Sequence, residues 1–88
     1  MRVKTPHGNY EVKNITFKDR RTLHRLELQA ISTDGDLKTN EFIDVLDWVM
    51  NYAFDDPEAK LSKLDDNQVD EVLMEIYNSY KGTNKKKS

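Results

Sequence analysis

The 88-residue chain contains no cysteine, so neither a disulfide nor a thiolate metal site can form. It has only two histidines, His7 and His24, which are too few for a histidine-built metal centre. Its three glycines cannot supply a glycine-rich phosphate loop. No apolar run exceeds three residues, and the first ten residues lack the apolar stretch of a secretion signal. We therefore expect a soluble cytosolic domain.

The side chains needed for common enzyme chemistry are also missing. No serine lies in a Gly-x-Ser-x-Gly elbow, and a cysteine nucleophile is excluded. Carboxylates are plentiful, but we interpret the neighbouring ones as solvated stripes and helix caps rather than as a catalytic pair. We predict that the chain is not an enzyme and binds no cofactor. The neighbouring carboxylates are Asp44 and Asp47, Asp55 and Asp56, and Asp65 and Asp66.

Segment 32–42 has the acidic composition of a calcium loop that precedes a helix, but its spacing fails. With Asp34 and Asp36 in the third and fifth positions of the loop, the sixth position is Leu37, where a glycine is required. The twelfth position is Ile43, which has no carboxylate to offer the ion. We predict no metal site.

The charges are segregated along the chain, although the net charge is only -2. Residues 1–25 carry seven Lys and Arg against two acids, and residues 26–80 carry three against fourteen. Opposite charge at the two ends of a small domain favours head-to-tail association or a polar partner, and a merely solvated surface is the alternative. The length allows one domain, for which we predict the bounds 1–82, and we expect the basic segment 83–88 to be disordered.

The N-terminal segment has the pattern of a β-hairpin at about residues 2–14. Val3 and Thr5 alternate with polar residues before the turn-forming segment 6–9, and Tyr10 and Val12 alternate after it. An isolated hairpin is marginally stable in water, so this one must pack against another element.

Segment 17–31 is predicted to be a helix, with Thr16 as its N-cap and Asp19 three residues later. It contains strong helix formers and neither glycine nor proline. Its periodicity is poor, and its last residues also alternate as a strand would, so a strand remains the alternative. In a helix, Leu23, Leu26 and Ala30 would share one face, and Phe17, Leu28 and Ile31 the opposite one.

The most informative element is a predicted helix at about 41–54, capped by Thr39 or Asn40. Its apolar arc covers about two thirds of the circumference, which is wider than one neighbouring helix can bury. Either the hairpin and first helix cover the remainder, or another subunit does. In the second case, aromatic and large apolar side chains would anchor the partner. These candidate anchors are Trp48, Tyr52, Phe54, Ile43 and Met50.

Two further helices follow. Pro57 suits the first position of a short helix, and Asp65 with Gln68 predicts the start of a last helix that stops at Gly82. The predicted fold is therefore mainly α with a small N-terminal β-hairpin (α+β), with three to four short helices. The apolar positions of the last helix are Val69, Val72, Leu73, Ile76, Tyr77 and Tyr80.

Basic residues in segment 18–25 offer a second kind of contact. Such a cluster attracts phosphates, so we keep a nucleic-acid-associated regulator as an alternative function. The sequence pI of 5.6 and the lack of a recognition helix argue against it. The cluster would otherwise pair with acidic stripes of this chain or of its neighbour. Its members are Lys18, Arg20, Arg21 and Arg25.

The order of these elements resembles that of the small tail assembly chaperones of long-tailed bacteriophages. The resemblance covers roughly residues 1–80 and is carried by the hairpin at 1–12, the helix start at 15–19 and the apolar patterns of 42–50 and 69–77. It implies a helical protein with a small N-terminal β element that forms homo-oligomers in the host cytoplasm. It also implies binding to the tape measure protein, which such chaperones keep soluble until the tail tube forms around it. A minor structural virion protein, such as a connector, is a further alternative.

Overall fold

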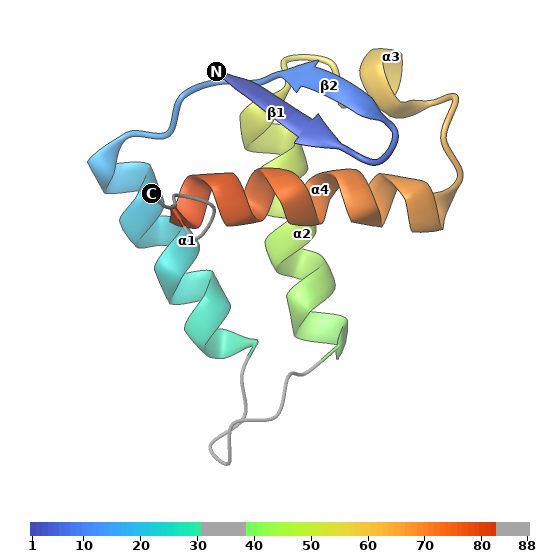
Figure 1. Ribbon diagram of the computed structural model, residues 1–88. Helices are drawn as coiled ribbons and strands as arrows, with labels where there is room; N and C mark the ends of the chain where they lie inside the picture. Colours follow the sequence, from blue (N-terminus) through green and yellow to red (C-terminus); the bar gives the residue numbers. More distant parts are fainter. Residues whose placement is uncertain (31–38, 83–88) are drawn as a thin grey trace.

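The computed structural model describes residues 1–30 and 39–82. Within these residues the protein is mainly helical with an N-terminal two-stranded antiparallel hairpin, so the predicted fold class is confirmed (Figure 1). The predictions for the acidic loop around Asp34 and for the tail 83–88 lie outside the described residues. The elements are β1 (Arg2–Thr5), β2 (Gly8–Glu11), α1 (Phe17–Gln29), α2 (Thr39–Ala53), α3 (Pro57–Leu61) and α4 (Asp66–Lys81).

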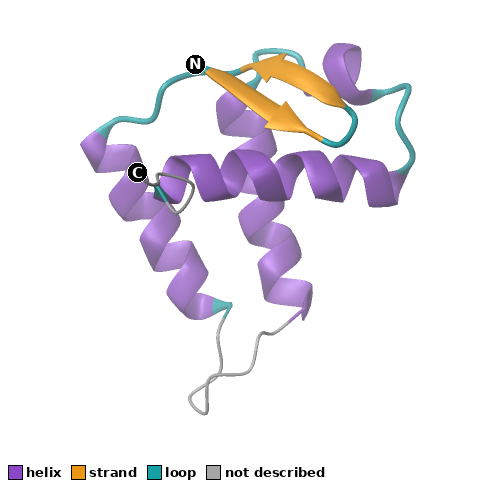
Figure 2. Ribbon diagram, in the orientation of Figure 1, coloured by secondary structure: helices purple, strands orange, loops and turns teal. Residues whose placement is uncertain are grey.

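The helices form two layers with the hairpin on the outside. α1 and α2 pack against each other, and α4 crosses α2. The hairpin lies on α4 through β1, on the side away from most of α2, as the orange strands of Figure 2 show. The hairpin thus acquires the packing partner that its small size requires.

The hairpin is shorter than predicted. Its strands pair from Arg2 with Glu11 to Thr5 with Gly8, so the turn is two residues long and Gly8 begins β2 with a φ of 118°. That positive φ suits glycine alone among the common residues. The strand ends at Glu11 rather than near 14, because the Lys13 amide donates to the carbonyl of Ala53 at 3.2 Å instead of to β1.

Segment 17–29 is a helix, and the strand alternative is wrong for these residues. The Thr16 hydroxyl oxygen accepts a hydrogen bond from the Asp19 amide at 3.1 Å, which confirms the predicted N-cap. Leu23 is fully buried, whereas 72% of Phe17 and 58% of Leu28 are exposed. α1 therefore uses one of its two apolar faces for the core and leaves the other in solvent.

α2 is covered mainly by its own chain. Val45 and Val49 are fully buried, and its predicted polar stripe, which includes Asp44 and Asp47, is exposed. The sequence left two ways to cover the wide apolar face of this helix, namely its own chain or another subunit. For most of that face, the covering residues come from the same chain. The predicted start is a correction: α2 begins at Thr39 rather than near 41, so Thr39 and Asn40 belong to the helix itself instead of capping it from outside. The side chains of these two residues lie outside the described part.

The predicted start of α3 and the predicted start and end of α4 are confirmed. Asp56 accepts from the Ala59 amide at 3.3 Å to cap α3, and Asp65 and Gln68 form a reciprocal capping box at the start of α4. α4 ends at Gly82, whose φ of 78° is left-handed. The side chains that α4 buries are Val72, Leu73, Ile76, Tyr77 and Tyr80.

Candidate binding surfaces

The five predicted anchors of α2 do not form one surface. Phe54 is only 4% exposed and packs edge-to-face against Tyr10 of the hairpin, with ring centroids 6.1 Å apart. Phe54 as a partner anchor is therefore a correction: β2 covers it, and a partner has no access to its ring. A helical wheel of this segment cannot show which of its side chains the N-terminal hairpin covers.

Trp48 and Tyr52 face a different neighbour. Their rings stack at 5.0 Å with an interplanar angle of 8°, and Tyr52 also packs edge-to-face on Tyr80 of α4. The Tyr52 hydroxyl donates to the carbonyl of Asn14 at 3.3 Å. Both rings are half-buried, and much of their surface is already used within the chain.

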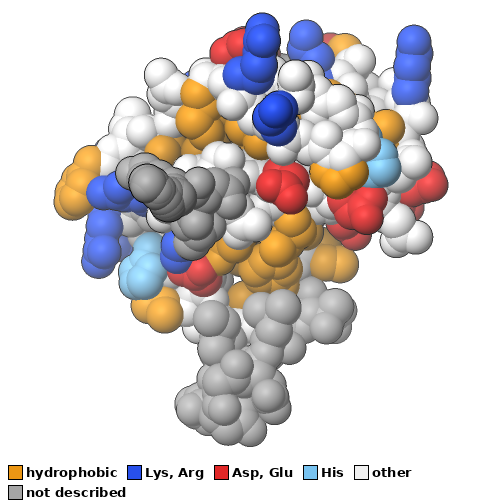
Figure 3. All heavy atoms as spheres, in the orientation of Figure 1, with side chains coloured by type: hydrophobic (Ala, Val, Ile, Leu, Met, Phe, Trp, Pro, Cys, Tyr) orange, Lys and Arg blue, Asp and Glu red, His pale blue; other side chains and the backbone are white. Residues whose placement is uncertain are grey.

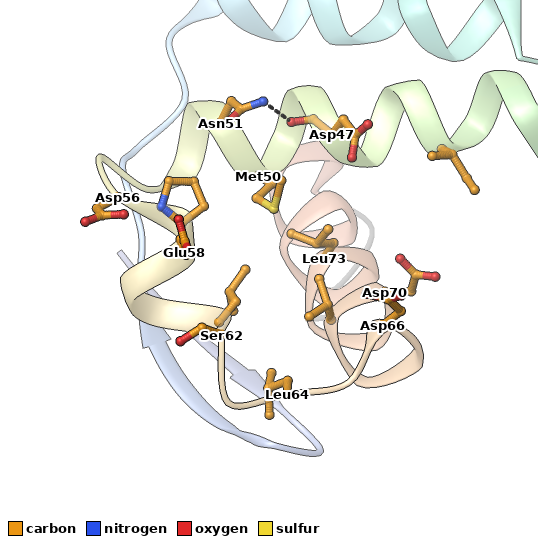
Figure 4. Close-up of a pocket in the computed structure, with 14 residues that line it drawn as sticks. Asp47, Met50, Asn51, Asp56, Glu58, Ser62, Leu64, Asp66, Asp70 and Leu73 are labelled. Atoms are coloured by element: carbon orange, nitrogen blue, oxygen red, sulfur yellow. Dashed lines mark hydrogen bonds between the residues drawn. The ribbon is translucent and has the colours of Figure 1, made fainter.

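Ile43 and Met50 lie together on a groove of about 810 Å³ between α2, α3 and the start of α4 (Figure 4). Ile43, which lines the groove, remains 47% exposed. Met50 points into the groove together with Leu73 from α4. The floor is apolar, and no other part of the described chain covers it. The apolar lining residues are Ile43, Met50, Pro57, Leu61, Leu64, Val69 and Leu73.

The rim of this groove is acidic. In Figure 4, Asp47 lies on the α2 side, Asp56 and Glu58 on the α3 side, and Asp66 and Asp70 on the α4 side. None of the lining residues in the described chain is Lys or Arg. Asp56 serves as the cap of α3, but the side chains of Asp47, Asp66 and Asp70 form no ion pair with any described residue. The groove therefore combines an apolar floor with uncompensated negative charge.

A basic surface lies on α1. Phe17, Arg20, Arg21 and His24 line a shallow depression of about 240 Å³ together with Lys81 of α4. The Arg20 guanidinium lies 5.8 Å from the centre of the Phe17 ring. Among residues 1–30 and 39–82, no acid pairs with any arginine of this surface.

The remaining members of the predicted basic cluster, Lys18 and Arg25, are also exposed and form no ion pair with a described residue. Pairing of the cluster with acidic stripes of its own chain, which the sequence left open, is therefore not seen in the part that the structure describes. Pairing with a neighbouring molecule remains open.

One carboxylate inside the fold is fully partnered. Glu27 of α1 accepts hydrogen bonds from the Tyr77 hydroxyl and the Lys81 ammonium of α4, and His24 Nδ1 lies 3.5 Å from it. Burial alone would raise the pKa of Glu27, but the hydrogen bonds from Lys81 and Tyr77 and the charge of Lys81 outweigh it and lower the pKa. This cluster joins the two helices and leaves no carboxylate free for chemistry.

Two phenols have raised pKa values for related reasons. Burial raises the pKa of Tyr77, and the hydrogen bond to Glu27 and its negative charge add to the effect. Burial also raises the pKa of Tyr80, with a smaller contribution from Tyr52. Both side chains therefore stay protonated and neutral well beyond the ordinary range of tyrosine.

The described part of the chain contains no group of three His, Cys, Asp or Glu side chains placed to hold a metal ion. None of its helices has both the length and the apolar character needed to cross a bilayer.

Sequence reasoning missed one wall of the groove and the tip of the basic surface. Leu61 comes from α3, Leu64 from the connection that follows it and Val69 from α4, and a helical wheel of α2 alone cannot reveal them. Phe17 was recognised only as lying on the second apolar face of α1. Its position three and four residues before two arginines is the signal that marks it as part of an exposed ridge.

Comparisons with known proteins add no relative to this description. No protein-family model matches the chain, and searches of curated proteins and of solved structures find no match.

Proposed function

We propose that this protein is a non-enzymatic phage tail assembly chaperone, which oligomerises and binds the tape measure protein during tail morphogenesis. The single observation that supports this most directly is the apolar groove beside α2, where the described chain leaves Ile43 exposed and Met50 only half-buried. The order of hairpin and helices, which resembles that of the chaperone family, is the second support.

The physical requirement of the role is an open apolar surface. A long, partly apolar helical client self-associates unless another protein covers its apolar face. A groove between helices accepts side chains from one face of an amphipathic helix, and its volume of about 810 Å³ lies within the range of binding clefts.

Co-expression with the tape measure protein encoded in the same phage tests this proposal. We expect the two proteins to co-purify, and we expect Ile43→Asp to reduce the recovered tape measure protein at least about tenfold, since it places a charge on the apolar edge. Leu28→Asp is the matched control, because Leu28 is equally apolar and even more exposed but lies on α1, away from the groove. Failure of the unmodified chain to co-purify would contradict the proposal.

A nucleic-acid-associated regulator is the second candidate, favoured by the unpaired cations of α1. It predicts binding to DNA or RNA that weakens steeply with salt and is lost when Arg20, Arg21 and Arg25 are replaced by alanine. A gel shift at low salt that shows no retarded band would dispose of this candidate without affecting the first one.

A further inference from the structure

α1 presents a ridge that has the form of a groove-binding helix. Phe17, Arg20, Arg21 and His24 are spaced i, i+3, i+4 and i+7, so their side chains follow one face. Phe17 at the tip is 72% exposed, the most exposed large apolar side chain among the described residues. Helices that dock into grooves use this spacing for their anchor residues.

The positive charges on and beside this ridge repel the positive end of the helix dipole. Lys18, Arg20 and Arg21 lie within the first five residues of α1, near the positive end of the helix dipole. No described acid pairs with them, and Asp19 is the only acid of the first turn. A negatively charged partner would relieve this repulsion.

The acidic groove supplies the complementary features. Its floor offers apolar contacts to a phenyl ring, and Asp47, Asp66 and Asp70 at its rim lack cationic partners within the described chain. α1 lies on the left of the molecule in Figure 1, whereas α3 and the start of α4 lie on the right. Figure 3 shows basic side chains over α1 and acidic side chains over the start of α4. A chain therefore cannot fill its own groove with its own ridge, but a second copy can.

We propose that the α1 ridge of one molecule docks into the α2/α3/α4 groove of a second copy, with Phe17 on the apolar floor and Arg20 and Arg21 facing the acidic rim. This deepens the oligomerisation named in the proposed function by identifying its interface. The contact is heterologous, because each copy offers a ridge on one side and a groove on the other. Repetition of such a contact gives closed rings or open filaments rather than an isolated two-fold dimer.

The molar mass measured by sedimentation velocity tests the contact first. The unmodified chain is expected to associate at about 50 mM salt and to dissociate progressively towards about 500 mM, because charges across a rim are screened. Phe17→Ala is expected to raise the dissociation constant at least about tenfold, as loss of a buried aromatic anchor does. Gln29→Ala, at an exposed position of α1 about 120° around the helix from Phe17, is expected to leave it unchanged.

A charge exchange then tests the pairing. Arg20→Glu with Arg21→Glu gives one variant, and Asp47→Lys with Asp70→Lys gives the other. Each variant alone is expected to be monomeric, because ridge and groove then carry like charges. Mixed in equal amounts, the two are expected to assemble again, because every ridge meets a groove of opposite charge in the other variant. All four side chains are exposed, and circular dichroism verifies that both variants fold.

Asp44→Lys with Asp55→Lys is the matched control, since it makes the same charge change at exposed positions outside the groove lining. It is expected to keep the mass of the unmodified chain. A monomeric unmodified chain at low salt, or folded single variants that still assemble, would overturn the proposed contact. Mixed variants that stay monomeric would overturn it as well.

Client binding is measured separately, so the two proposals can fail separately. If the charge exchange restores assembly but no tape measure protein co-purifies, the interface stands and the chaperone function fails. If the tape measure protein co-purifies with an unmodified chain that is monomeric at all salt concentrations, the interface fails and the chaperone function loses only its oligomeric form.

Discussion

The hydroxyl of Tyr80 donates a hydrogen bond to the backbone carbonyl of Lys13, with 2.6 Å between the two oxygens. The amide of the same Lys13 donates to the carbonyl of Ala53 at the end of α2. One residue of the connecting segment is therefore held by α4 on one side and by α2 on the other. This attachment places the hairpin over α4 and keeps β2 against Phe54.

Removing the phenol of Tyr80 tests how much this attachment contributes. Tyr80→Phe keeps the ring packing but leaves the Lys13 carbonyl without its donor, so we expect a loss of about 1–2 kcal/mol in the free energy of unfolding. Thermal denaturation would then show a fall in Tm of roughly 4–16 °C for a domain of this size. Tyr52→Phe is the control, because its bond to Asn14 is longer and exposed and should cost clearly less. Equal effects of the two variants would contradict the assigned role of Tyr80.

Truncating a side chain on one apolar face of α1 is expected to lower the stability of the fold, whereas truncation on the other face is expected to change it little. Leu23→Ala opens a cavity in the core and is expected to cost about 2–5 kcal/mol, whereas Leu28→Ala removes an exposed side chain and is expected to stay within about 0.5 kcal/mol. Urea denaturation of both variants measures the difference. Similar losses for both would mean that α1 does not pack through its Leu23 face.

Glu27 is expected to make stability depend on pH in the acid range. Its pKa in the folded protein lies below the ordinary 4.5, so it stabilises the fold above that pH, and the contribution is lost as pH falls through the folded value. Glu27→Gln removes this contribution, so the stability difference between neutral pH and about pH 3 should shrink relative to the unmodified chain. Asp44→Asn, at an exposed position, controls for the change in net charge. An unchanged pH profile in Glu27→Gln would contradict the partnered geometry.

Tyr77 and Tyr80 are expected to make the stability of the fold fall at alkaline pH. Their pKa values are raised above the ordinary 10.0, so the protein gains stability from them below that pH and loses it as pH rises towards the folded values. Spectrophotometric titration of the four tyrosines should therefore show a late fraction that ionises together with unfolding. The double variant Tyr77→Phe with Tyr80→Phe should lack this fraction. A late fraction that persists in it would point to other residues.

Much of the fold was predictable because its signals are local. Thr16 and Asp65 cap their helices through side chains that reach only three residues ahead, and Gly82 ends α4 through its own φ. The regular spacing of α4 likewise predicts its buried face, because Val72 and Ile76 recur with the helical period. Such features depend on neighbours in the sequence and need no knowledge of the tertiary arrangement.

The candidate surfaces were predicted only in part, because they combine elements distant in the chain. The wide apolar arc of α2 indicated that this helix has several neighbours, but not which side chains they cover. Tyr10 covers Phe54, and Tyr80 packs against Tyr52, while Ile43 stays exposed. The end of the hairpin was misplaced for the same reason, since the Lys13 amide donates to the carbonyl of Ala53 in α2 rather than across the hairpin.

The sequence by itself determined the class of the fold, the starts of three helices, the segregation of basic from acidic residues and the absence of cysteine chemistry. These properties follow from residue types and short-range spacing. Only the tertiary structure decided which apolar side chains of α2 stay open, and that the acidic rim surrounds them while the basic ridge of α1 lies on the other side. Burial is a property of packed surfaces, and the packing of α3 and α4 beside α2 is what forms the groove.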